Sequence, residues 1–385
     1  MTTALEGIRV VEITNYVAGP FAGLLLADMG ADVVKVEMPP LGDPYRAWES
    51  GTYSSTFYAH NRNKRSILVD LRTPRGLEVV RALAQQADVL IENSRVGAME
   101  RLGLGYEALR ETNPRLIYCS ITGFGSTGPY IERPGYDTLG QAMSGLLSQL
   151  TDLDRPEAMG ISLSDHLAGS YAAYGILGAL MARERTGEGQ RVDTSLLQAS
   201  IGIVGENLTR YLASGEVLTR ESRVRTAQVF ACTDQVGAPF VIHLSSPDKF
   251  WLALLDAIGH SELASDPRFA TRAARQENRE AVQELLNGVF ATGSREEWLA
   301  RLQAHDVPCG PISSLDEVAA DPQVQHLGIV QEVTHPDVGA MRVVSSGVSL
   351  GGTPLRLGPA PLLDEHRAEI LAQLGLALDY LDKTS

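Results

Sequence analysis

Asp165 is the residue whose type and position best fit covalent chemistry. It opens a helix predicted over residues 164–182, and the helix N-terminus stabilises its carboxylate as the anion. Such a carboxylate can attack an activated acyl group and form a covalent intermediate. The same position also suits an Asp that only caps the helix. The glycines around Asp165 could serve either of two purposes, close approach of a substrate to the backbone or tight packing of helices. These glycines are Gly160, Gly169, Gly175 and Gly178.

Two basic segments are candidates for binding an anion. Residues 61–65 (NRNKR) precede a predicted strand, and either hold phosphates through Arg and Lys or form a solvated loop. Arg95 and Arg101 belong to a second segment, the loop over residues 92–97 and the residues just after it, at the carboxyl end of another predicted strand. Ligands of open α/β sheets bind at that end, although Arg101 also suits an exposed helix position.

The first half of the chain alternates strand and helix patterns. β-Branched runs predict strands over residues 8–14, 31–37, 66–71, 87–93 and 116–122. Helical patterns lie between them, over residues 21–29, from Thr73-Pro74 onward, and over 98–111. This alternation predicts βαβ units and a parallel sheet, and therefore an α/β fold.

The second half follows other patterns. Residues 137–150, 164–185 and 193–212 appear helical, with a turn over 186–193. Strands over 227–232 and 239–244 and helices over 247–259, 275–291 and 295–304 predict a smaller α+β domain, before a final helix over 365–374. We expect a large domain over residues 1–212, a linker over 213–225, the small domain over 226–330, and a segment over 331–385 that packs back on another domain.

Composition excludes several classes of protein. The 47 acidic and 33 basic residues give a net charge of -14, which argues against general nucleic-acid binding. Cys119, Cys232 and Cys309 form no CxxC pair, so we expect neither a disulfide framework nor a zinc site, and a reducing cytoplasm fits. Neither a secretion signal nor a membrane span is predicted.

The usual nucleotide and hydrolase motifs are missing. The turn after the first strand reads AGPFAG, which lacks the GxGxxG spacing, so an NAD enzyme is compatible with the topology but unsupported by the motif. No P-loop, HExxH or GxSxG sequence occurs.

Ordered segments from one end of the chain to the other resemble the class III CoA-transferases, a family that includes formyl-CoA and carnitine CoA-transferases and, more distantly, the α-methylacyl-CoA racemases. The matching segments are residues 5–12, 18–20, 30–37, 42–46, 63–71, 87–93, 100–107, 121–129, 135–145, 164–169, 186–196, 307–312 and 360–366. The resemblance implies a large Rossmann-like domain, a smaller domain, an interlocked homodimer, and a C-terminal segment that returns to the large domain.

The resemblance also implies a mechanism and a set of site residues. Asp165 corresponds to the catalytic aspartate of the family, which forms an aspartyl mixed anhydride and then an aspartyl-CoA thioester. The implied substrates are an acyl-CoA donor and a carboxylic acid acceptor; coenzyme A is a substrate, and no metal or other cofactor is expected. The implied CoA contacts are Ala18, Leu71, Arg72, Asn93, Ser94, Arg95, Gly97, Arg101, Leu102, Tyr136 and Asp137.

Departures from the family pattern bear on specificity and on the alternatives. Val17 and Met38 replace a glutamine and a CoA-binding arginine of formyl-CoA transferase, which argues against oxalate and formate as substrates. A racemase acting by α-proton exchange is the first alternative, but Tyr136 stands where the racemases carry a histidine. His166 does not replace it, because adjacent helix residues point in different directions. A non-catalytic CoA-binding protein is the second alternative, and the retained Asp165 argues against it.

Overall fold

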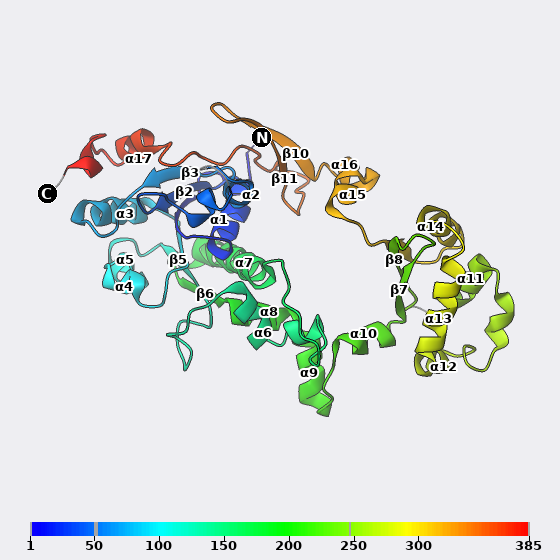
Figure 1. Cartoon of the computed structure of the whole chain (residues 1–385). Coiled ribbons are helices and arrows are strands. Elements are labelled where there is room, and N and C mark those ends of the chain that lie inside the picture. Colours follow the sequence, from blue (N-terminus) through cyan, green and yellow to red (C-terminus); the bar gives the residue numbers. More distant parts are fainter. Residues whose placement is uncertain (1, 50–52, 246–247, 384–385) are drawn as a thin grey trace. The chain divides into compact units, whose positions relative to one another are not determined.

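The computed structural model describes residues 2–49, 53–245 and 248–383. Contacts divide the chain into two compact units. Unit 1 comprises residues 1–147, 157–208 and 328–385, and unit 2 comprises residues 148–156 and 209–327. Each unit therefore combines stretches that are distant in sequence, as the colours of Figure 1 show. The domain boundaries expected at residues 212, 225 and 330 stay predictions.

Unit 1 is built on a six-stranded parallel sheet, as the alternation of elements predicts. Its strand order is β3-β2-β1-β4-β5-β6, the order of a Rossmann-like doubly wound fold. The strands are β1 (Arg9–Ile13), β2 (Asp32–Glu37), β3 (Arg65–Leu68), β4 (Val89–Glu92), β5 (Ile117–Thr122) and β6 (Arg191–Ser195).

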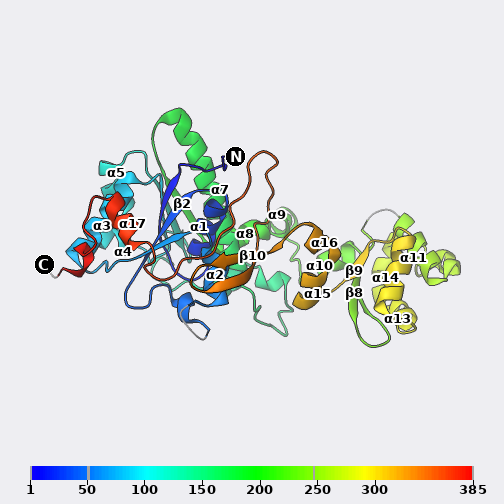
Figure 2. The same ribbon diagram turned by 90° about the horizontal axis from the view of Figure 1, so that it is seen from above.

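Helices cover both faces of this sheet. They are α1 (Ala18–Asp28), α2 (Ser55–Asn61), α3 (Pro74–Gln86), α4 (Ala98–Arg101), α5 (Tyr106–Thr112), α6 (Asp137–Met143), α7 (Leu163–Thr186), α8 (Leu196–Ile203) and α17 (Arg367–Gln373). Alternate strand residues point to opposite faces, so Val10 packs with α1, α7 and α8, whereas Val11 packs with α3 and α17. Figure 2 shows these two groups of helices on either side of the sheet.

Sequence patterns missed β6 and merged short helices. Residues 186–193 were expected to be a turn, but Arg191–Ser195 pairs with β5 as an edge strand. This segment is short and mostly polar, so it lacks the apolar signal of a central strand. The helix expected over 98–111 is two helices, because Gly103 adopts a φ of 65° between α4 and α5.

Unit 2 contains the antiparallel sheet β7 (Val229–Thr233), β8 (Pro239–His243) and β9 (Cys309–Pro311). Its helices are α10 (Arg220–Thr226), α11 (Lys249–Ile258), α12 (Arg272–Glu277), α13 (Arg279–Phe290), α14 (Arg295–Ala304), α15 (Leu315–Ala320) and α16 (Pro322–His326). The helix α9 (Gly205–Ser214) spans the boundary between the units. The expected α+β character of this region agrees with its antiparallel sheet and helices, and part of the expected linker is helix α10.

The C-terminal segment packs on unit 1. It begins with a hairpin of β10 (Val330–His335) and β11 (Gly339–Val344). Asp364 accepts a hydrogen bond from the Leu68 amide at 2.7 Å, and the Arg46 guanidinium donates one to the Pro361 carbonyl at 3.1 Å. Ile370 and Leu371 of α17 are fully buried in the core beside α3.

A group of buried charges lies beneath the carboxyl end of the sheet. Lys35 Nζ contacts Glu12 Oε1 at 3.0 Å and Asp43 Oδ2 at 2.9 Å, and Lys64 Nζ contacts Glu12 Oε2 at 2.7 Å. All four side chains are fully buried. We call Glu12, Lys35, Asp43 and Lys64 the buried charge cluster.

Neither reading of the basic segment 61–65 is correct. Its cations pair with acids of the fold: Lys64 with Glu12, Arg62 with Asp28, and Arg65 with Asp32 at 2.6 Å. Arg62 and Lys64 are buried, so the segment is neither a phosphate site nor a solvated loop. Charge density alone could not distinguish these cases, because the partner acids come from other elements.

Within the described part of the chain, no helix combines the length and the apolarity needed to cross a membrane.

The substitution Lys35→Met tests the buried charge cluster. The substitution removes the positive charge that Glu12 and Asp43 share in the interior, so their buried negative charges are less well neutralised. We therefore expect the free energy of unfolding to fall by about 3–5 kcal/mol. Urea denaturation followed by circular dichroism measures the change. Lys383→Met removes a half-exposed pair with Asp379 and is the control, with an expected change below about 1 kcal/mol. Equal effects of the two substitutions would contradict the prediction.

Candidate active site

Asp165 lies in the first turn of α7, beside a second carboxylate. The Asp165 backbone amide donates a hydrogen bond to Asp137 Oδ1 at 3.2 Å, and Gln141 Nε2 donates one to Asp137 Oδ2 at 2.5 Å. Burial, together with the neighbouring Asp137 charge, raises the pKa of Asp165 to about 7. A carboxyl group with such a pKa is more basic than an ordinary aspartate and still half ionised near neutral pH.

Glycines allow the helices around Asp165 to pack closely. A Cβ atom at Gly169 would lie 2.6 Å from the Ala18 carbonyl oxygen of α1, and one at Gly140 would lie 2.8 Å from Ser164 Oγ. Any larger residue would push these helices apart. Of the glycines noted in the sequence, Gly169 and Gly175 therefore serve packing, whereas Gly160 and Gly178 face open space.

Asp165 borders a cavity of about 960 Å³ within unit 1. Loops after β1, β4 and β5 contribute to its wall, so it opens at the carboxyl edge of the sheet, where β1 and β4 are neighbours and the strand order reverses. Most of the expected site residues line it: Ala18, Asn93, Ser94, Arg95, Gly97, Arg101, Tyr136, Asp137 and Asp165.

Three expected contacts do not line this cavity. Leu71 is buried in the core beside α3, and Leu102 packs against the same core. Arg72 has a side chain that is 72% exposed and forms an ion pair with Asp70 at 2.8 Å. Met38, which the sequence comparison with formyl-CoA transferase singled out, lies next to Leu71, whose amide donates to Met38 Sδ at 3.4 Å.

Reciprocal hydrogen bonds join the two loops that meet at the strand-order reversal. The Asn15 amide donates to Asn93 Oδ1 at 3.0 Å, and Asn93 Nδ2 donates to the Asn15 carbonyl at 2.8 Å. Gly97 has a φ of 80°, and a Cβ atom there would lie 3.1 Å from Arg101 Nη1. The Arg101 guanidinium therefore lies across the backbone of the loop, and both border the cavity.

Aromatic side chains that no sequence motif indicates form a wall of the cavity. Tyr16, Tyr45 and Trp48 line it, with 5.5 Å between the ring centroids of Tyr16 and Tyr45. Asp43 Oδ1 accepts hydrogen bonds from the amides of Tyr16 at 3.3 Å and Tyr45 at 3.0 Å. Asp43 belongs to the buried charge cluster, so that cluster supports the wall directly.

The backbone of Tyr16 is in the left-handed region, with a φ of 66°. A non-glycine residue adopts this conformation only when its surroundings hold it, and such residues concentrate at functional sites. Two contacts stabilise this conformation: the hydrogen bond from the Tyr16 amide to Asp43 and the adjacent hydrogen bonds between Asn15 and Asn93. No sequence motif indicates this conformation.

A closed loop forms another part of the wall. A Cβ atom at Gly123 would lie 2.5 Å from the Gly135 Cα atom, so two glycines allow the ends of the loop to cross. Within it the Arg133 guanidinium lies 4.0 Å from the centroid of the Tyr130 ring, and both residues border the cavity. The two glycines are visible in the sequence, but their contact with each other is tertiary and cannot be predicted from local pattern.

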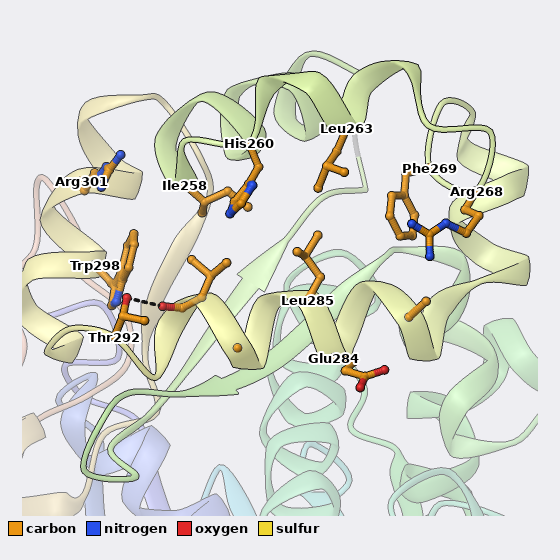
Figure 3. A pocket seen from close by; sticks show the side chains of 13 residues that line it. Ile258, His260, Leu263, Arg268, Phe269, Glu284, Leu285, Thr292, Trp298 and Arg301 are labelled. Carbon is orange, nitrogen blue, oxygen red and sulfur yellow. Dashed lines mark hydrogen bonds between the residues drawn. The ribbon is translucent and has the colours of Figure 1, made fainter.

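A second cavity, of about 740 Å³, lies within unit 2 (Figure 3). It is bordered by residues of α11, α13 and α14 together with the segment that joins α11 to α12, and Arg268, Arg301 and Glu284 are its charged residues. Its polar groups are spread around an open groove, and it has no counterpart of the Asp137–Asp165 pair among its lining residues.

Comparisons with known proteins agree with this architecture. The family model described as CoA-transferase family III matches residues 5–367. A succinate–glutarate CoA-transferase of Agrobacterium fabrum is 38% identical, with 96% of this chain and 95% of that protein covered. A succinyl-CoA–D-citramalate CoA-transferase of Chloroflexus aurantiacus is 36% identical, with 98% and 96% covered.

A solved structure is equally similar. The crystal structure of a CAIB/BAIF family protein from Brucella suis has a TM-score of 0.89 and 38% sequence identity. The match covers 97% of this chain and 100% of that chain. The resemblance seen in the ordered sequence segments is thereby confirmed, and the chain belongs to CoA-transferase family III.

Proposed function

We propose that this protein transfers coenzyme A from an acyl-CoA donor to a carboxylic acid acceptor, with Asp165 as the covalent nucleophile. The observation that carries the proposal is the position of Asp165, beside Asp137 and at the border of a cavity of about 960 Å³ that Arg95 and Arg101 also line. The names of related proteins, which describe CoA transfer among succinate, glutarate and citramalate, support the reaction class.

The first half-reaction loads the enzyme. The Asp165 carboxylate attacks the thioester carbonyl carbon, the C–S bond breaks, and a mixed anhydride and CoA thiolate form. The thiolate then attacks the aspartyl carbonyl carbon, which releases the donor acid and leaves an aspartyl-CoA thioester.

The second half-reaction reverses these steps with the acceptor. The acceptor carboxylate attacks the aspartyl thioester, releasing thiolate and forming a new mixed anhydride. Attack of the thiolate on the acceptor's carbonyl carbon gives the new acyl-CoA and regenerates the Asp165 carboxylate. Each step exchanges one activated acyl group for another, so no net proton transfer is needed.

The charged part of CoA requires local cations. Arg95 and Arg101 border the cavity beside the loop over residues 93–97, and we assign them to the phosphates of the nucleotide. Arg72 is already paired with Asp70 and is a weaker candidate. The side chain of Ala18 is a single methyl group and Gly97 has none, which permits close approach of the ligand to the backbone.

The racemase alternative requires an additional base near the α-carbon. Among the lining residues of the cavity there is no histidine, and Tyr136 occupies the position at which the racemases have one. The His166 ring is directed toward His60, with 3.4 Å between their Nε2 atoms. The arrangement therefore favours acyl transfer over α-proton exchange.

The substitutions Asp165→Ala and Asp165→Asn test the nucleophile. We expect both to lower the transfer rate by at least about 10⁴-fold, because no covalent intermediate forms. Incubation of the native enzyme with succinyl-CoA and hydroxylamine should give a hydroxamate at Asp165, detected by peptide mass spectrometry. Asp137→Asn is the matched control and should keep the adduct. Normal transfer by Asp165→Ala would refute the mechanism.

The pH profile tests the Asp137–Asp165 pair. Asp165 reacts as the carboxylate, so kcat/KM of the native enzyme should rise with pH through about 7. Asp137→Asn removes a like charge and lowers the pKa of Asp165, which moves the acidic limb to lower pH. Burial remains and keeps the limb above the ordinary value of 3.8.

Asp137→Asn changes the charge of this side chain but keeps its size. The new amide keeps the acceptor for the Asp165 amide, whereas Gln141 Nε2 loses its carboxylate acceptor and keeps its second acceptor, the Ile161 carbonyl oxygen at 3.2 Å. Glu132→Gln changes another acid at the cavity and is the control, with no expected shift. An unchanged limb in Asp137→Asn would show that the two carboxyls do not interact.

We also propose the interlocked homodimer that the family resemblance implies. Support comes from an exposed face of α7 formed by Tyr171, Tyr174, Gly178 and Met181, at helical spacing. Tyr174 is 75% and Met181 is 65% exposed, which is unusual for contiguous large apolar groups of a monomer.

Subunit exchange tests the interlocking. Light scattering should give twice the mass of one chain at micromolar concentration. Tagged and untagged proteins mixed under native conditions should form no mixed dimers, whereas unfolding and refolding them together should do so, since linked chains separate only by unfolding. Monomers in light scattering, or exchange within minutes, would contradict the proposal.

A further inference from the structure

Two histidines, one of them the residue that follows Asp165, are arranged in a way that the acyl-transfer steps do not use. His60 of α2 and His166 of α7 face each other, with 3.4 Å between their Nε2 atoms. His60 Nδ1 lies 2.9 Å from the Thr56 carbonyl oxygen, and His166 Nδ1 lies 2.7 Å from the Ser162 carbonyl oxygen. Neither ring is fully exposed.

The hydrogen-bond partners determine which ring nitrogens carry protons. A carbonyl oxygen can only accept, so both Nδ1 atoms must donate, and in the neutral state both Nε2 atoms would present lone pairs. Two lone pairs facing each other at 3.4 Å repel. One additional proton changes this contact into an N–H···N hydrogen bond between an imidazolium and an imidazole.

We propose that His60 and His166 hold a single shared proton between their Nε2 atoms and thereby position the first turn of α7, which carries Asp165. This inference rests on the proposed function for its catalytic consequence, but the shared proton itself does not. It makes His60 and His166 positioning residues, because neither lines the cavity.

Surrounding groups favour one proton over two. Burial, with the adjacent His166, lowers the pKa of His60 to about 4, which disfavours a second proton on the pair. Lys64 opposes a positive charge at this place, whereas Asp43 favours it. The other groups packed around the pair are the rings of Phe21 and Tyr45, with Phe21 4.8 Å from His166 and Tyr45 6.1 Å from His60.

The positioning effect passes through Ser162. Its carbonyl oxygen accepts both the His166 backbone amide, at 3.1 Å, and His166 Nδ1. Ser162 and Asp165 border the cavity on either side of the start of α7. Orientation of the His166 ring by His60 therefore fixes the end of α7 where the nucleophile lies.

The experiment combines NMR of ¹⁵N-histidine-labelled protein with the pH profile of transfer. His60→Gln keeps a neutral N–H donor for His166 Nε2, whereas His60→Leu removes any partner. His260→Gln, at a histidine paired with Glu262 in unit 2, is the control. In the native protein, the two Nε2 signals, assigned by the variants, should change in one common step that involves one proton.

We expect His60→Gln to abolish that step and to keep transfer within about threefold of the native rate, and His60→Leu to lower kcat about tenfold with little change in KM. Independent titration of the two rings would overturn the proposal even if the Asp165 tests succeed. So would stoichiometric binding of Zn²⁺ that His60→Gln abolishes, because the pair would then be a metal site. Identical kcat in both variants at every pH would refute the positioning role.

Discussion

The buried charge cluster is the constraint on which the active-site architecture depends. Glu12, Lys35, Asp43 and Lys64 have no access to solvent, so each charge is tolerated only while its partners stay in place. The cluster joins β1, β2, the segment before β3 and the turn after β2. Because Asp43 also binds the amides of Tyr16 and Tyr45, displacement of one charge would disturb the wall of the cavity.

Burial of a charge is also unfavourable at Asp165, but there it changes the pKa of the carboxyl group in the opposite direction. Here a carboxyl group is partly buried beside another carboxylate, and the described residues place no cation in an ion pair with it, so its pKa rises instead of falling. The contrast with Glu37 is instructive, since Arg46 and Lys35 hold the pKa of that buried carboxyl below its ordinary value. Cations therefore lower the pKa of Glu37 and of Asp43 in the buried charge cluster, whereas burial and Asp137 raise the pKa of Asp165 at the cavity.

The net charge of -14 therefore says little about anion binding. Some basic residues that the sequence offers for anion binding form ion pairs inside the fold instead, as Arg62 and Lys64 do. The cations that line the cavity are few: Arg95 in the loop after β4, Arg101 at the end of α4, and Arg133 in the loop closed by Gly123 and Gly135. A polyanionic substrate needs such local charges, and the remainder of an acidic surface does not prevent its binding.

How much the sequence could predict differs between elements. The first five strands follow from apolar runs, because central parallel strands are buried on both faces. The polar edge strand β6 and the break between α4 and α5 escaped prediction, since short segments carry weak periodicity. Most of the expected site residues lie around one cavity because they occupy the carboxyl ends of neighbouring strands, whereas Tyr16 and Tyr45 carry no local signal for the site.

By itself, the sequence determined the parallel α/β fold, the family, and Asp165 as the candidate nucleophile, because these depend on local periodicity and on ordered motifs. Only the tertiary structure decided which charges are buried, that Asp137 lies against Asp165, and that His60 meets His166. These pairs join residues far apart in the chain, and their pKa values and proton positions depend on distance and burial. Neither quantity exists until the helices and strands have packed.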